Sequence, residues 1–96
     1  MSPLKKNKLT KLRLKLDKLD NSLILIIKKR TNLVKKVLTL KDKKNQIVDQ
    51  KRIKMILKNI RQKSVKNNID PKITNKIWKN MILAYIDFEK RNFKKK

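Results

Sequence analysis

The chain has 96 residues, with 30 Lys or Arg against seven Asp or Glu, and its formal net charge is +23 at pH 7. Cysteine, histidine and glycine are all absent, which excludes disulfides, zinc-thiolate and metal-histidine sites, imidazole catalysis and glycine-rich phosphate loops. At this length we expect one small domain spanning residues 1–96.

The first predicted element is a long helix from Leu9 to Leu40. Its apolar seam advances in steps of three or four residues, the spacing of one packed helix face, and consists of Leu9, Leu12, Leu16, Leu19, Leu23, Ile26, Leu33, Val37 and Leu40, with Arg30 in the one remaining place. Such a helix measures about 48 Å, whereas a compact monomer of this size is about 30 Å across. The excess length predicts a homodimer in which the long helix of a partner chain lies alongside.

Arg30 interrupts this seam with a charge. An unpaired guanidinium sheltered there would cost several kcal/mol, so an anion is expected to meet it. That anion could be Asp20 or Glu89 of another helix, in a structural ion pair, or a bound ligand. Alternatively, the Arg30 side chain could extend along the apolar surface and place its charge in solvent. The chain holds five Arg against 25 Lys, and each retained Arg is a candidate for the two-pronged grip on a carboxylate or phosphate that lysine lacks.

A polar connection and a second, shorter helix come next. Residues 41–50 lose the helical period and gather Asp, Asn and Gln, which predicts a loop. The second helix is predicted from about Asp49 or Gln50 to Lys66, with Asp49 as a plausible N-cap. Its apolar face consists of Ile53, Ile56, Leu57 and Ile60.

The start of the third helix is predicted from a capping residue followed by a proline. Asp70 is suited to cap it, and Pro71 suits its first turn, where a missing amide hydrogen costs nothing. The helix is predicted to reach about Phe93, and its broad apolar face consists of Ile73, Ile77, Trp78, Met81, Ile82, Tyr85 and Phe88. The basic tail, residues 94–96, is expected to fray. The predicted fold class is therefore all-α, with a core over about residues 9–93.

Three further charged residues stand out by position. Arg13 lies beside the apolar seam of the first helix. Lys41 comes eleven residues after Arg30, almost three full turns, so the two should lie near one face of that helix. Glu89, the only glutamate, falls one turn after Tyr85 on the otherwise apolar face of the third helix. Their scarcity and placement favour a site for a small anion.

The net charge also permits a different class of function. Polycations bind nucleic acids and anionic membrane surfaces by releasing counterions. However, the lysines are spread along the whole chain, and Lys, Ile and Asn make up 47 of its 96 residues, a bias that A/T-rich codons would produce. The longest apolar run, residues 23–27, is too short to cross a bilayer. No signal peptide is recognised, and we expect a cytoplasmic protein.

Three stretches together resemble the all-helical (AroQ-type) chorismate mutases, including the related isochorismate-pyruvate lyases. They are LRLKLDKLDNSLILIIKKRTNLVKKVLTLK, VDQKR and IDPKITNKIWKNMILAYIDFEK. Order, spacing and helix lengths are similar from Leu9 to about Phe93. The resemblance implies three helices per chain in an intertwined homodimer, with two active sites each built from both chains. It also implies the rearrangement of chorismate to prephenate, without cofactor or metal.

The same resemblance assigns roles to four of the charged residues. Arg13, contributed by the partner chain, and Arg30 would grip the two carboxylates of the substrate. Lys41 would donate a hydrogen bond to the breaking ether oxygen, and Glu89 would face that oxygen from the opposite side. The protein would hold the substrate in a compact conformer and stabilise charge, forming no covalent bond with it.

The loop side of the implied site departs from the family pattern. Asp49 and Arg52 would help to fix the ring hydroxyl and a carboxylate, and Tyr85 stands where a small hydroxylated residue is common. Ile53 follows Arg52, where the family usually has a glutamate that binds the ring hydroxyl. In having an apolar residue at this position, the chain is similar to the isochorismate-pyruvate lyases, which share the fold. The elimination of pyruvate from isochorismate, which those enzymes catalyse, is therefore the alternative reaction.

Glu89 sets a condition on pH. The position that corresponds to Glu89 in these chorismate mutases is often glutamine, which donates a hydrogen bond at any pH, whereas glutamate donates only when protonated. An ionised Glu89 would repel the charge that develops on the ether oxygen. We therefore expect a rate that falls as pH rises, and a flatter profile for Glu89→Gln.

Overall fold

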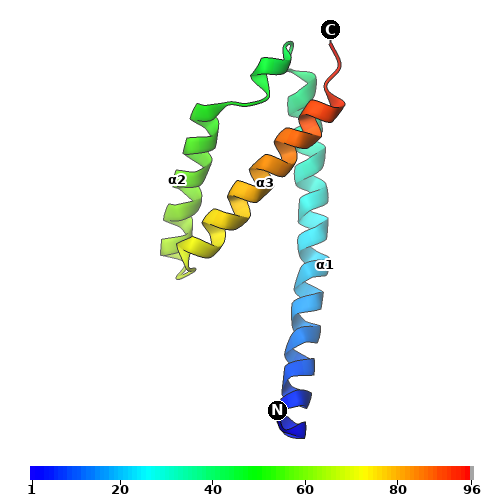
Figure 1. Ribbon diagram of the computed structural model, residues 1–96, viewed down its shortest axis with the longest axis vertical. Helices are drawn as coiled ribbons and strands as arrows, with labels where there is room; N and C mark the ends of the chain where they lie inside the picture. The colour runs from blue at the N-terminus through cyan, green and yellow to red at the C-terminus, as the bar shows by residue number, and fades with distance from the viewer. Residues whose placement is uncertain (96) are drawn as a thin grey trace. The chain divides into compact units, whose positions relative to one another are not determined.

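The computed structural model describes residues 1–95 and consists of helices joined by short connections (Figure 1). The helices are α1 (Pro3–Thr39), α2 (Gln50–Lys66) and α3 (Pro71–Asn92), with a 3₁₀ turn, η1 (Lys44–Gln46), before α2. No strand occurs in the part of the chain that is described. The predicted all-α class, with one long and two shorter helices, is confirmed.

The chain divides into two compact units, residues 1–33 and the residues from Val34 onward. The first unit is the greater part of α1. This helix begins at Pro3 instead of the predicted Leu9, because the local chemistry of a helix start is complete there. Ser2 Oγ accepts a hydrogen bond of 3.2 Å from the backbone N–H of Lys5, and Pro3 takes the first helical position.

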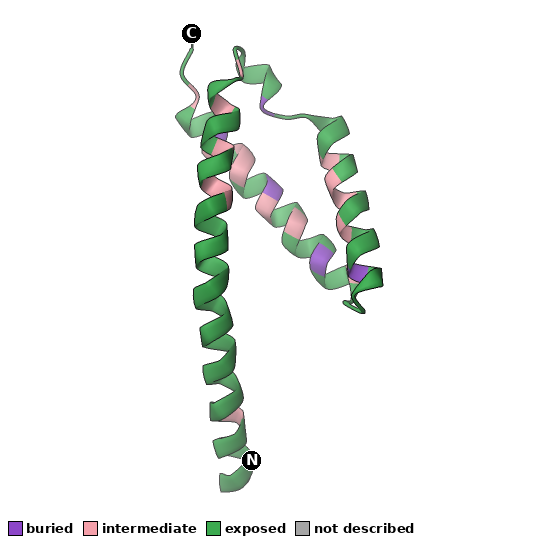
Figure 2. Cartoon of the chain, turned by 180° about the vertical axis from the view of Figure 1, so that it is seen from behind, coloured by how far each residue is buried: buried purple, intermediate pink, exposed green. Residues whose placement is uncertain are grey.

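α1 buries none of its residues. Apart from the half-buried Leu9, the seam leucines of the first unit are about half exposed or more, for example Leu12 at 56% and Leu19 at 65%, and Figure 2 shows the helix as exposed along nearly its whole length. A lone helix cannot cover its own apolar stripe, so this seam has no packing partner within its own unit.

The second unit begins with the last turn of α1 and the loop that follows. Leu40 and Lys41 continue the turn through 3₁₀-type bonds to Val37 and Leu38, of 3.0 and 3.1 Å. The side chain of Gln46 then closes the loop, because its Oε1 accepts from the backbone N–H groups of residues 42 and 43 at 2.7 and 2.8 Å. Ile47, only 4% exposed, anchors the loop in the core of this unit.

α2 and α3 have the limits that their caps predict. Asp49 accepts from the backbone N–H of Arg52 at 3.0 Å, and Asp70 accepts from that of Lys72 at 2.9 Å. Between the helices, Asn68 adopts a φ of 57°. This left-handed residue ends α2 in a glycine-free chain, since asparagine tolerates the conformation better than most residues.

The core of the second unit lies where α2 packs against α3. Ile82 is buried, and the predicted apolar face of α2 is half-buried throughout. A hydroxyl pair, Ser64 Oγ and Thr74 Oγ1 at 2.7 Å, joins the two helices near their shared corner. On α3 the predicted face is buried or half-buried from Trp78 to Phe88, whereas Ile73 and Ile77 at its start are 55% and 51% exposed in the single chain.

The remaining sequence predictions concern the tail and the membrane. Lys94 and Lys95 follow α3 as non-helical, exposed residues, and Lys96 lies outside the described residues. Over residues 1–95 no helix combines the length and apolarity that a bilayer crossing requires.

Candidate functional site

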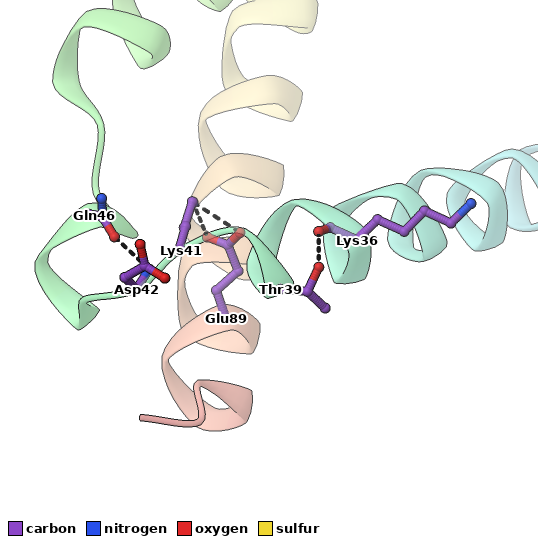
Figure 3. Close-up of polar contacts among 6 residues, drawn as sticks. All are labelled: Lys36, Thr39, Lys41, Asp42, Gln46 and Glu89. Carbon is purple, nitrogen blue, oxygen red and sulfur yellow. Dashed lines mark hydrogen bonds and ion pairs between the residues drawn. The ribbon is translucent and has the colours of Figure 1, made fainter. Parts of the chain in front are cut away.

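The site centres on an ion pair between the loop after α1 and the end of α3. The Nζ atom of Lys41 lies 3.2 Å from both Oε1 and Oε2 of Glu89, as Figure 3 shows. The two residues are 48 positions apart in the chain. Both were predicted as site residues, and the structure brings them into direct contact.

Glu89 is the one charged side chain that the structure buries between residues 1 and 95, with an exposed fraction of 6%. Removing a carboxylate from water costs several kcal/mol unless a counter-charge meets it. Lys41 supplies that charge with a side chain that is itself 19% exposed. The pair is therefore a sheltered charge cluster, in contrast to the pair of Arg91 with Asp87, which is more than 60% exposed on both sides.

Lys41 reaches Glu89 from the loop that was predicted over residues 41–50. It was predicted near one face of the first helix with Arg30, but α1 ends at Thr39. Lys41 stands two residues beyond it, in the 3₁₀ extension of the last turn. The predicted place of Lys41 at the start of the loop is therefore confirmed, and the tightened turn continues the winding of the chain.

The loop-side residues Asp49 and Arg52 lie together at the start of α2. The carboxylate of Asp49 caps the helix, so its structural role is confirmed. The guanidinium of Arg52 is exposed, with its Nη1 atom 3.9 Å from Met55 Sδ. Both side chains face solvent here, and their contact with a substrate stays a prediction. Tyr85 is half-buried on α3, one turn before Glu89.

Arg13 and Arg30 belong to the first unit, on one continuous helix. Arg13 is exposed and Arg30 is half-buried. Seventeen residues of helix separate them by about 25 Å along its axis. This distance is too great for one small dicarboxylate to contact both arginines of the same chain.

A pocket of about 420 Å³ runs beside the apolar face shared by α2 and α3. It is lined by Val48, Gln50, Ile53, Leu57, Lys79, Ile82, Leu83, Ile86 and Lys90. Its walls are mainly aliphatic, its two charges are both positive, and Ile53 contributes to it directly. None of the seven predicted site residues lines this pocket. The sequence could have indicated it, because its α3 residues recur at helical spacing.

The arrangement suits the binding of a small anion more than metal chemistry. Between residues 1 and 95, no three side chains of the metal-ligating kinds gather in one place. What the second unit offers instead is an ammonium group held at a buried carboxylate, with an arginine and an aliphatic pocket on neighbouring elements. These groups can hold, orient and stabilise charge.

Comparison with known families gave one match. The family model described as chorismate mutase type II matches residues 12–90. A search of curated proteins and a search of solved structures found no match.

Proposed function

The chain belongs to the chorismate mutase type II family, and from this premise we propose that it catalyses the rearrangement of chorismate to prephenate. The observation that carries the proposal is the extent of the match, residues 12–90. That range contains every residue proposed for the site, from Arg13 to Glu89. We further propose that the enzyme works without cofactor or metal, as a single domain, in the cytoplasm.

The reaction needs positioning and charge stabilisation. The substrate carries two carboxylates and must be folded while negative charge gathers on its breaking ether oxygen. In the proposed site Arg30 grips one carboxylate through its planar fork, and Arg52, with Asp49, orients the ring from the loop side. Tyr85 provides a half-buried wall next to Glu89.

Lys41 and Glu89 act on the ether oxygen in this proposal, and their ion pair must open for the substrate to enter. The 3.2 Å contacts between Nζ and both carboxylate oxygens leave no room for a third atom between the two groups. The incoming substrate therefore competes with Glu89 for the ammonium group. Only a neutral carboxyl group at this position can donate a hydrogen bond to the ether oxygen.

We propose that the active molecule is a homodimer in which the two α1 helices pack along their seams. Support comes from the exposure of the seam, since α1 buries no residue. The run Leu23–Ile27 adds to it, because five consecutive apolar residues cover every side of a helix and all five are exposed. A helix segment that is apolar all round is normally buried on all sides.

A dimer also resolves the distance between Arg13 and Arg30. The two lie about 25 Å apart on one α1, so a site that uses both must take them from different chains. We propose that Arg13 of the partner subunit and Arg30 hold the two carboxylates of one substrate molecule.

Product identification tests this proposal. Purified protein is incubated with chorismate and, separately, with isochorismate, and the products are identified by chromatography and mass spectrometry. We expect prephenate from chorismate. Absence of any product from either compound, with a folded helical protein, would overturn the proposed activity.

The second candidate is isochorismate-pyruvate lyase, and the position of Ile53 favours it. This half-buried residue lines an aliphatic pocket beside Ile82 and Ile86. An aliphatic wall gives no hydrogen bond to a ring hydroxyl, whose desolvation then goes uncompensated. Pyruvate and salicylate formed from isochorismate would identify this reaction.

A further inference from the structure

A separate pocket lies where the last residues of α1 meet the end of α3, within the second unit. Its volume is about 420 Å³, and it is lined by Lys35, Leu38, Thr39, Phe88, Asn92, Lys94 and Lys95. Leu38 and Phe88 give it an apolar wall, and the three lysines make its charge positive. No acidic residue lines it, and it shares no residue with the proposed catalytic set.

The lysines of this pocket have no counter-charge among residues 1–95. The two acidic residues at this end of α3 are already paired with other cations, Asp87 with Arg91 and Glu89 with Lys41. Three ammonium groups around one apolar hollow repel one another. A bound anion would relieve this repulsion.

The uncharged polar side chains of the pocket direct their donors elsewhere. The hydroxyl of Thr39 donates to the backbone oxygen of Lys36 at 2.6 Å, as Figure 3 shows. The amide nitrogen of Asn92 donates to the backbone oxygen of Phe88 at 2.8 Å. The lysine ammonium groups are thus the main partners that the pocket offers to an anion.

We propose that this pocket binds a small carboxylate that carries one apolar ring. The lysines would hold the carboxylate as mobile point charges, while Leu38 and Phe88 would cover the ring. The volume lies in the range typical of small-molecule sites. An inorganic oxyanion would use the charges but none of the apolar wall, and would bind more weakly for that reason. Binding here does not require that the chain be an enzyme.

Calorimetry with simple probes tests the proposal. Benzoate, acetate and inorganic phosphate are titrated into the full chain at constant ionic strength. We expect benzoate to bind about tenfold more tightly than acetate or phosphate, because only benzoate buries a ring. Equal affinity for the three probes would show that only charge is recognised, and would overturn the proposed ligand class.

Matched variants and NMR locate the binding. Lys35→Gln/Lys95→Gln removes two charges from the pocket and should weaken benzoate binding about tenfold. The control Lys51→Gln/Lys54→Gln removes the charges of two exposed α2 lysines that line none of the pockets described. It should change the affinity for benzoate less than about twofold. Benzoate should shift the methyl signals of Leu38 and leave those of Ile82 unchanged. Shifts at Ile82, or equal effects of the two double variants, would place the carboxylate elsewhere and refute the proposal.

Discussion

The ammonium group of Lys41 lies 3.2 Å from both carboxylate oxygens of Glu89, across 48 residues of chain, in the least exposed charged position of the described structure. Removing one partner of a buried pair leaves the other uncompensated. We expect Lys41→Met to lower the free energy of unfolding by about 3 kcal/mol, and Glu89→Gln by about 1 kcal/mol, because the amide is neutral and still accepts from Lys41.

Urea denaturation at one fixed protein concentration measures both effects. Asp87→Asn is the matched control, since it breaks the exposed pair with Arg91 two residues earlier on the same helix. This substitution should lower the free energy of unfolding by less than about 0.5 kcal/mol. Equal losses of unfolding free energy for Asp87→Asn and Lys41→Met would show that the buried pair stabilises the fold no more than the exposed pair does.

The rate of chorismate rearrangement should fall as pH rises. An ionised Glu89 holds Lys41 and opposes the developing negative charge, whereas a glutamine at this position donates a hydrogen bond to the ether oxygen at any pH. The Glu89→Gln variant carries no titrating group at this position, so its profile should be flatter. Profiles of kcat and kcat/KM over a range of pH check this, and an equally steep fall in the variant would contradict it.

Arg30→Lys should reduce kcat/KM by about a hundredfold or more, because lysine keeps the charge but loses the planar two-point grip. Circular dichroism serves as the check that the helices are retained. A nucleic-acid or membrane-surface binder would respond differently. Its affinity would barely change with this substitution and would fall steeply with added salt.

Mixing two inactive variants tests whether Arg13 acts across the dimer. Arg13→Ala and Arg30→Ala chains are each expected to be inactive alone. After subunit exchange, a mixed dimer would hold one site with both arginines intact, and random pairing would restore about a quarter of the sites. Steady-state assays before and after exchange measure the recovery. If both arginines served the same site from one chain, activity would not return.

Ile53→Glu should shift substrate preference toward chorismate. The new carboxylate would offer an acceptor for the ring hydroxyl from a wall that is now aliphatic, with Lys79 and Lys90 lining the same pocket to offset its charge. The ratio of kcat/KM for chorismate to that for isochorismate is the measurement, and Ile53→Val is the control for altered packing. A ratio that rises equally in both variants would speak against a contact at this position.

The limits of α2 and α3 could be predicted because local chemistry determines them. The carboxylates of Asp49 and Asp70 cap the two helices, and Pro71 suits a first turn. The start of α1 was missed because the apolar seam was used in place of the cap formed by Ser2. An apolar seam indicates which part of a helix packs against a partner, whereas a capping residue indicates where the helix begins.

The contacts of the site were harder to predict from sequence. Glu89 and Lys41 were identified as charges near a site, but their direct contact depends on a loop closed by Gln46 and anchored by Ile47. Such pairings over long stretches of chain leave no periodic trace in the sequence. The pocket lined by Ile53 was also missed, although the helical spacing of its α3 residues could have indicated it.

α1 is 37 residues long and buries none of them. A helix in a protein takes most of its stability from the packing of its apolar face, and the seam of α1 has no such packing within its own unit. If two chains complete each other as proposed, folding and encounter form a single equilibrium governed by mass action. The activity per chain would then rise with the concentration of the protein in the cell. Dilution would unfold the chain and abolish its activity at the same time.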